Sequence, residues 1–121
     1  MTTNPLARHG GLSYLQIPAN DAKASAAFYE AVVGWRTHED GRGVWKFDEP
    51  AGFLIGRWSI TLAPAAPGFL PHFYVSDVRA AVARAVKAGG AVVKAPHPEG
   101  DTVGAQLRDP AGNVLGVWQF A

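Results

Sequence analysis

The chain contains no cysteine, and this absence excludes three kinds of chemistry at once. Disulfide bonds, thiol nucleophiles and thiolate metal sites are all unavailable to it. Long hydrophobic runs are also missing, and no apolar stretch reaches the length that crosses a bilayer. Residues 1–11 lack the basic-then-apolar order of a secretion signal. The sequence therefore predicts a cytoplasmic protein with no membrane partner.

The chain also lacks a marked excess of positive or negative charge. Lysine and arginine total 11 against 10 acidic residues, and the basic residues are scattered along the chain. Proteins that bind nucleic acid gather their basic residues into a patch or stripe, so we expect no nucleic-acid partner. The 121 residues, 48% of them hydrophobic, suit one globular domain with its own core.

What the chain does contain is an internal duplication. Asp21 begins an alanine-rich helical pattern that ends thirteen residues later at Gly34, and Asp77 begins another that ends thirteen residues later at Gly90. An Asp at the start accepts hydrogen bonds from the free N–H groups of a helix, and a Gly suits the left-handed conformation at its end. Each helical pattern lies between one strand pattern and three more, which predicts two similar strand–helix–strands units.

The expected elements have the same order in both halves. In the first half they are a strand at 12–17, a helix at 22–33 and strands at 35–39, 44–47 and 53–58. In the second they are a strand at 69–75, a helix at 78–88 and strands at 91–94, 103–108 and 114–120. Residues 1–11 are expected to be flexible, with module one at about 12–61, a linker at about 62–68 and module two at about 69–121. Residues 95–101 read as a Pro- and Gly-bearing loop able to cover a pocket.

Three motifs together resemble one known superfamily. They are Asp21 through Phe28-Tyr29 to Gly34-Trp35, then Val75-Ser76-Asp77-Val78 with Gly89-Gly90, then Asp109-Pro110-Ala111-Gly112-Asn113. In this order and spacing they are similar to the vicinal oxygen chelate superfamily, which includes glyoxalase I, extradiol dioxygenases, fosfomycin-modifying enzymes and bleomycin-resistance proteins. The resemblance implies an α+β fold of two tandem βαβββ modules that form a cupped, mostly antiparallel sheet. It also implies a site in the concavity and a homodimer, with the pocket either within one chain or across two.

Strand alternation supplies most of the candidates for the wall of this cup. The substrate-binding candidates are Tyr14, Gln16, Trp58, Gln106, Arg108 and Trp118. His72 and Tyr74 are the catalytic candidates, because an imidazole titrates near neutral pH and a neighbouring phenol can orient a ligand oxygen or donate a proton. An aromatic cup with few polar groups suits a small organic ligand, of aromatic or polyketide-like character.

The metal ligands that the resemblance implies are not matched. Its last ligand is a Glu four residues after the Gly of the Asp-Pro-x-Gly turn, and here that position is Gly116. The other expected positions carry no His or carboxylate, whereas a catalytic divalent ion takes about three such ligands. We therefore expect neither a metal nor another cofactor.

Three interpretations of function remain open. The favoured one is a metal-independent protein that binds a small molecule and either sequesters it or transforms it by acid–base chemistry. The second is a metal-dependent lyase or oxygenase with displaced ligands, such as Gln16, His72 and residues of His97–Asp101. The third is a non-catalytic structural or regulatory protein whose cup is filled by its own side chains.

Overall fold

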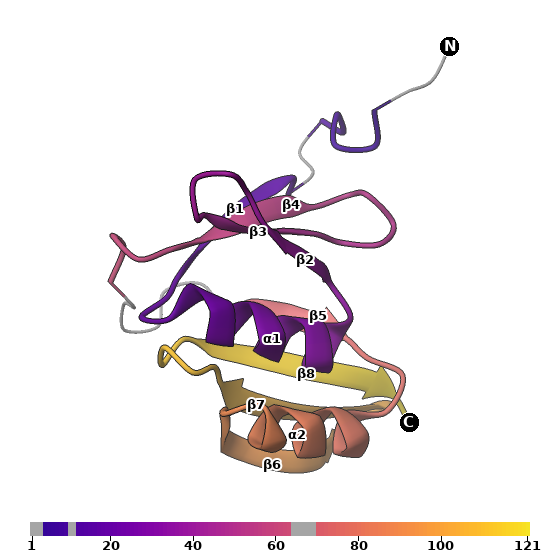
Figure 1. The fold of residues 1–121 in the computed structure, drawn as a ribbon. Coiled ribbons are helices and arrows are strands. Elements are labelled where there is room, and N and C mark those ends of the chain that lie inside the picture. Colours follow the sequence, from indigo (N-terminus) through magenta and orange to yellow (C-terminus); the bar gives the residue numbers. More distant parts are fainter. Residues whose placement is uncertain (1–3, 10–11, 64–69) are drawn as a thin grey trace.

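The computed structural model contains the two expected βαβββ modules (Figure 1), and it describes residues 4–9, 12–63 and 70–121. The elements of module one are β1 (Tyr14–Pro18), α1 (Ala22–Val33), β2 (Arg36–Glu39), β3 (Trp45–Asp48) and β4 (Ile55–Ser59). Those of module two are β5 (His72–Tyr74), α2 (Val78–Lys87), β6 (Ala91–Glu99), β7 (Thr102–Arg108) and β8 (Val114–Phe120). The α+β class is confirmed. Most of the predicted linker and part of the predicted flexible N-terminal segment lie outside the described residues.

Each module builds its own four-stranded sheet. The strand order is β1-β4-β3-β2 in sheet A and β5-β8-β7-β6 in sheet B, so the duplication extends to the topology. In both sheets the first strand pairs parallel with the last strand of its module, and the other pairs are antiparallel. α1 packs on sheet A and α2 on sheet B, which leaves each sheet with one helix-free face.

Both helix starts and the end of α1 follow from local capping, as predicted. The prediction that the second helix ends at Gly90 is wrong, because α2 ends at Lys87 and the left-handed glycine after it is Gly89. The side chain of Asp21 accepts a hydrogen bond from the Ala24 N–H at 3.2 Å, and that of Asp77 accepts one from Ala80 at 3.1 Å. α1 ends at Gly34, whose φ of 74° lies in the left-handed region that glycine adopts without strain. Because these capping signals involve residues close together in the chain, they can be predicted from the sequence alone.

An aromatic stack forms the centre of the core and joins the two modules. The indole of Trp35 stacks on Phe47 with ring centroids 4.1 Å apart and on Tyr29 at 5.1 Å. From module two, the edge of Phe73 meets Trp35 at 5.4 Å. α1 also packs against α2. The modules are therefore held together on their helix sides.

A buried carboxylate provides a second, polar connection between the modules. Asp109 is 3% exposed and accepts hydrogen bonds from the Tyr29 hydroxyl at 2.9 Å and from the backbone N–H groups of Ala111 and Asn113. The Asn113 amide donates both to Asp109 and to the carbonyl of Pro18 in module one. The turn between β7 and β8 is thus tied to α1 and to the end of β1.

The prediction of a covering loop at residues 95–101 is wrong. β6 continues through both prolines to Glu99, and a turn at Gly100 and Asp101 leads into β7. β6 is an edge strand of sheet B, where a proline removes no hydrogen bond needed by a second neighbour. Two register shifts, between Val92 and Lys94 and between Lys94 and His97, accommodate the irregular backbone. No described helix is both long enough and apolar enough to span a membrane.

Replacing Tyr29 with phenylalanine tests the connection through Asp109. The change keeps the stacked ring but removes one donor from a buried carboxylate, so we expect a loss of about 1–3 kcal/mol in the free energy of unfolding. Urea denaturation measures this loss. Tyr14→Phe is the matched control, since Tyr14 is 51% exposed and should change stability by less than about 0.5 kcal/mol. Equal effects in the two variants would contradict the assignment.

The same tyrosine should make stability fall at alkaline pH. Burial, together with the charge of Asp109 and their hydrogen bond, raises the pKa of Tyr29 well above its usual value of about 10. Above about pH 10 the unfolded chain loses this proton while the folded chain keeps it, so the free energy of unfolding declines as pH rises. Denaturation between pH 8 and 11 should show that the stability advantage of the natural chain over Tyr29→Phe shrinks above pH 10. A difference in the free energy of unfolding that stays constant from pH 8 to 11 would contradict the raised pKa of Tyr29.

Candidate functional site

The helix-free face of sheet B collects most of the polar and aromatic candidates in cross-strand rows. One row holds His72, Gly116, Gln106 and Lys94, and the next holds Tyr74, Trp118, Gly104 and His97. A third row holds Phe120, Thr102 and Glu99. The alternate residues of these strands, including Ala105, Leu107, Leu115 and Val117, are buried on the helix side. Strand alternation thus gives this face the composition that the sequence predicted for it.

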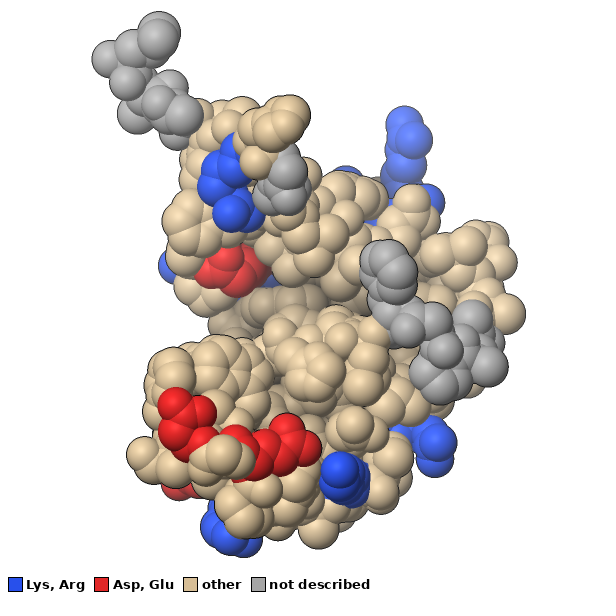
Figure 2. Space-filling view, turned by 180° about the vertical axis from the view of Figure 1, so that it is seen from behind, with Lys and Arg blue, Asp and Glu red and all other residues tan. Residues whose placement is uncertain are grey.

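Three aromatic side chains form an exposed patch on this face. Tyr74, Trp118 and Phe120, which we call the aromatic patch, meet edge to face or tilted, with ring centroids 5.1 to 6.2 Å apart. Tyr74 is 58% exposed and Phe120 is 61% exposed. Figure 2 shows a recess between the two halves of the molecule; in the lower half an uncharged surface lies above a band of acidic side chains, with basic side chains below and to the right. An exposed aromatic surface of this kind is typical of a binding face.

The imidazole of His72 is held in one orientation. Its Nδ1 lies 2.9 Å from the carbonyl oxygen of Leu70, and because a carbonyl only accepts, Nδ1 carries a proton. In the neutral ring this leaves the lone pair on Nε2. The ring lies over Gly116, where an added Cβ would come within 2.4 Å of its Cδ2 atom. His72 can therefore present Nε2 as a base on the helix-free face, beside Tyr74.

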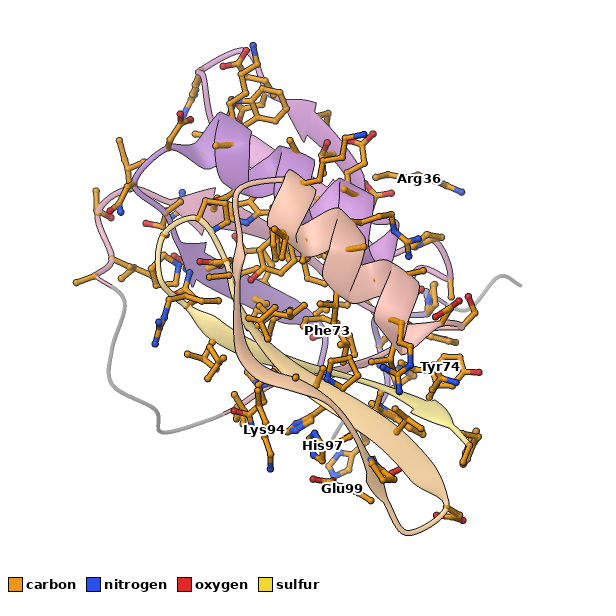
Figure 3. All side chains as sticks on the ribbon, turned by 90° about the horizontal axis from the view of Figure 1, so that it is seen from below. Arg36, Phe73, Tyr74, Lys94, His97 and Glu99 are labelled. Carbon is orange, nitrogen blue, oxygen red and sulfur yellow. The ribbon has the colours of Figure 1, made fainter. Side chains whose placement is uncertain are left out.

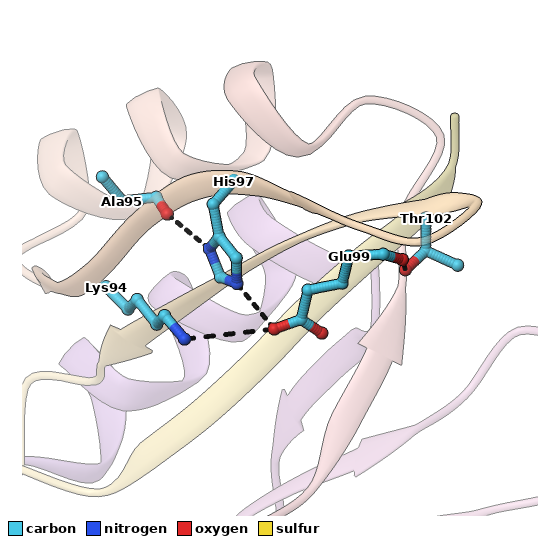
Figure 4. Close-up of polar contacts among 5 residues, drawn as sticks. All are labelled: Lys94, Ala95, His97, Glu99 and Thr102. Carbon is cyan, nitrogen blue, oxygen red and sulfur yellow. Dashed lines mark hydrogen bonds and ion pairs between the residues drawn. The ribbon is translucent and has the colours of Figure 1, made fainter.

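A charged cluster, Lys94, His97 and Glu99, lies at the β6 edge of the same face (Figures 3 and 4). The Nε2 atom of His97 is 2.7 Å from Glu99 Oε1, and its Nδ1 is 2.9 Å from the Ala95 carbonyl. Lys94 Nζ approaches the same Glu99 oxygen at 3.9 Å. The hydrogen bond to Ala95, then that to Glu99, raises the pKa of His97, while the hydrogen bond and charge of His97 lower the pKa of Glu99.

Sequence reasoning treated this segment as a loop and so placed its side chains on no face. The available signal was partial. His97 and Glu99 pair with Gly104 and Thr102, which alternate with core residues of β7, but a register shift between Lys94 and His97 breaks the alternation within β6. The prolines at 96 and 98 masked that signal, because proline usually interrupts a strand.

Two of the remaining candidates lie on sheet A, and Arg108 lies on sheet B. Tyr14 and Gln16 are exposed on its helix-free face, and Arg57 of the neighbouring β4 donates to Gln16 Oε1 at 3.4 Å. Figure 1 shows sheet A and sheet B at different levels of the molecule, with α1 between them. Arg108 is exposed near the end of β7, one row beyond Gln106. The structure therefore brings the candidates together as two groups on two sheets.

The prediction that Trp58 lines the pocket is wrong. In the parallel pairing of β1 with β4, Trp58 lies opposite Ile17 and so points to the helix side. It is 2% exposed and packs near Phe47, with ring centroids 5.0 Å apart. The neighbouring residue Arg57 takes the helix-free face instead.

The donor set does not fit the divalent metal that the resemblance implies. Within residues 4–9, 12–63 and 70–121, no three His, Asp or Glu side chains gather closely enough to hold an ion. At Gly116 the space for a ligand side chain is covered by the ring of His72. An open hollow of about 330 Å³ lies near the end of α1 and shares Tyr74 with the aromatic patch; Glu30, Ser76 and Arg84 are among its other lining residues.

Two pseudo-repeated βαβββ modules with an exposed aromatic face define the class of the protein, a two-module α+β scaffold of the vicinal oxygen chelate type. The sequence profile of the glyoxalase-like domain family matches residues 14–118, and the chain belongs to that family.

Relatives and solved structures agree with this assignment. CFP32 of Mycobacterium bovis, which carries the provisional name of a glyoxylase, is 27% identical over 122 residues that cover 93% of this chain. The match covers 46% of CFP32, so the chain spans about half the length of this curated relative. A glyoxalase/bleomycin resistance protein/dioxygenase family enzyme from Burkholderia phytofirmans superposes with a TM-score of 0.72 at 25% identity, covering 92% of this chain and 99% of that one. TnmS3, an antibiotic binding protein from Streptomyces, shares the fold with a TM-score of 0.67 at 23% identity, covering 91% of this chain and 95% of its own.

Substituting two tryptophans by alanine tests which of them lies in the core and which lies on the binding face. Trp58→Ala removes a buried ring and should lower the free energy of unfolding by about 3–5 kcal/mol. Trp118→Ala removes a partly exposed ring and should cost less than about 2 kcal/mol. Urea denaturation compares the two, and a larger loss for Trp118 would overturn the placement of both residues.

Proposed function

We propose that the protein binds a small aromatic or polyketide-like molecule on the helix-free face of sheet B. The observation that carries this proposal is the aromatic patch, in which Tyr74 and Phe120 are exposed and Trp118 is half-buried although such side chains usually contribute to a core. The fold shared with an antibiotic binding protein supports it at the level of architecture. Stacking on the patch supplies affinity, and the polar side chains beside it supply orientation.

His72 and Tyr74 provide the means for acid–base chemistry on the bound molecule. The fixed Nδ1 proton leaves His72 Nε2 available to accept a proton, and the Tyr74 hydroxyl lies on the same face one row away. Gln106, in the row of His72, offers an amide to a ligand oxygen. These residues support a lyase or isomerase type of reaction as well as simple binding.

We further propose that the protein acts without a metal or another cofactor. The reason is the chemistry of the residues, because His72 covers the position at Gly116 where a ligand is expected and the described part of the chain lacks a triad of ligating side chains. A divalent ion would have to draw its ligands from separate rows of the sheet.

A homodimer would complete the pocket. Tyr14 on sheet A and Leu12, which precedes β1, are 51% and 64% exposed, and the candidates on the two sheets lie apart within one chain. Placing sheet A of one protomer over sheet B of its partner would bring Gln16 and Arg57 toward the aromatic patch. It would also cover the exposed apolar side chains of both faces.

Ligand screening with a matched pair of variants tests the proposal. Thermal shift and tryptophan fluorescence with a panel of planar aromatic and polyketide compounds should reveal at least one ligand, and Trp118→Ala should weaken its binding by roughly tenfold or more. Val86→Ala, on the exposed side of α2, should leave the affinity unchanged. Sedimentation of the complex then gives the number of protomers per ligand.

Two further measurements distinguish the mechanisms. Binding that survives a chelator agrees with metal independence, whereas loss of binding that returns with a divalent ion would contradict it. If the ligand is transformed, His72→Ala should abolish turnover while retaining most of the affinity. Undiminished turnover in that variant would remove His72 from the chemistry.

A further inference from the structure

The middle of the helix-free face of sheet B has an open position at Gly104. Gly104 lies between Trp118 on β8 and His97 on β6 in the same cross-strand row. A Cβ added there would meet only the Val117 carbonyl oxygen, at 3.7 Å. At Gly116, by contrast, the equivalent space is taken by His72. The sheet therefore has a gap in its layer of side chains at one position.

The backbone spacing across this row leaves room for a flat ring. Trp118 and His97 lie on strands two spacings apart, so their Cα atoms are separated by about 9–10 Å. A flat ring with one carbon contact distance on either side needs about 7–8 Å. One ring can thus lie above Gly104, with Trp118 on one side and His97 on the other.

One wall of the gap carries positive charge. Both ring nitrogens of His97 face acceptors, the Ala95 carbonyl and the Glu99 carboxylate, and this arrangement favours the protonated ring, in which both nitrogens donate. Lys94 adds a second positive charge against the single negative charge of Glu99. The described groups at this edge therefore favour an electron-rich or anionic ring over a neutral one.

We propose that the gap above Gly104, between Trp118 and His97, is a subsite for a planar aromatic ring that carries an anionic substituent. The proposal rests on the proposed function and narrows its ligand class. Trp118 supplies the stacking surface, Gly104 supplies the room, and His97, held by Glu99, supplies the charge that selects the anion.

Two fluorescent probes with the same rings test this subsite. 1-Anilinonaphthalene-8-sulfonate is anionic, and N-phenyl-1-naphthylamine is its neutral counterpart. The natural protein should bind both, the sulfonate about two- to fivefold more tightly, as expected for a partly exposed cation. Gly104→Leu fills the gap and should weaken both probes roughly tenfold, because the ring loses its buried surface.

The controls separate a blocked site from a damaged fold. Gly41→Leu makes the same substitution at an exposed turn glycine where an added Cβ also meets nothing within 4 Å, and it should bind like the natural protein. Gly104→Ala, which adds a single carbon into open space, provides a folded variant if the leucine is not tolerated, and it should weaken both probes in the same direction. His97→Gln should keep the naphthylamine affinity and lose the preference for the sulfonate.

The outcomes also separate the two proposals. If the natural protein binds neither probe, the proposed function and the subsite both fail. If both probes bind unchanged to Gly104→Leu and Gly104→Ala, or if His97→Gln keeps the sulfonate preference, the subsite is wrong while the proposed function stands.

Discussion

The arrangement of the two modules depends on the buried carboxylate of Asp109. A charge that is 3% exposed is costly unless every oxygen has donors, and here Tyr29, Ala111 and Asn113 provide them. Tyr29 comes from the helix of the other module, and Asn113 also donates to Pro18 at the end of β1. The turn cannot satisfy Asp109 in full without module one in place. Because these hydrogen bonds are directional, they fix the relative orientation of the two modules. The aromatic core would otherwise constrain that orientation only by packing.

Joining the modules through their helix sides has a consequence for function. Both sheets turn their second faces outward, so the residues of those faces are free of core packing and available for a ligand or a partner protomer. On sheet B this freedom appears as the exposed aromatic patch and the row of polar side chains beside it. On sheet A it appears as Tyr14, Gln16 and Arg57. The duplicated scaffold therefore offers two different surfaces with one topology.

The chemistry of the sheet B face is shaped by two glycines with opposite roles. Gly116 lets the imidazole of His72 lie flat on the sheet, which orients Nε2 and removes the place for a metal-binding side chain. Gly104 leaves the space above the sheet open between Trp118 and His97. A side chain at either position would change the face without changing the fold. Relatives that share this architecture can accordingly differ in chemistry.

The sequence by itself determined the features that depend on near neighbours. Asp21, Gly34 and Asp77 mark the helix ends because capping involves residues three or four positions apart, and alternation assigned the faces of β5, β7 and β8. The tertiary structure decided the features that depend on strand pairing. It buries Trp58 on the helix side, and it extends β6 through its prolines to His97 and Glu99. It also divides the candidate residues between two sheets. The reason is physical, because a strand's face, length and neighbours are set by hydrogen bonds to segments distant in the chain, and local sequence carries no record of which segment that will be.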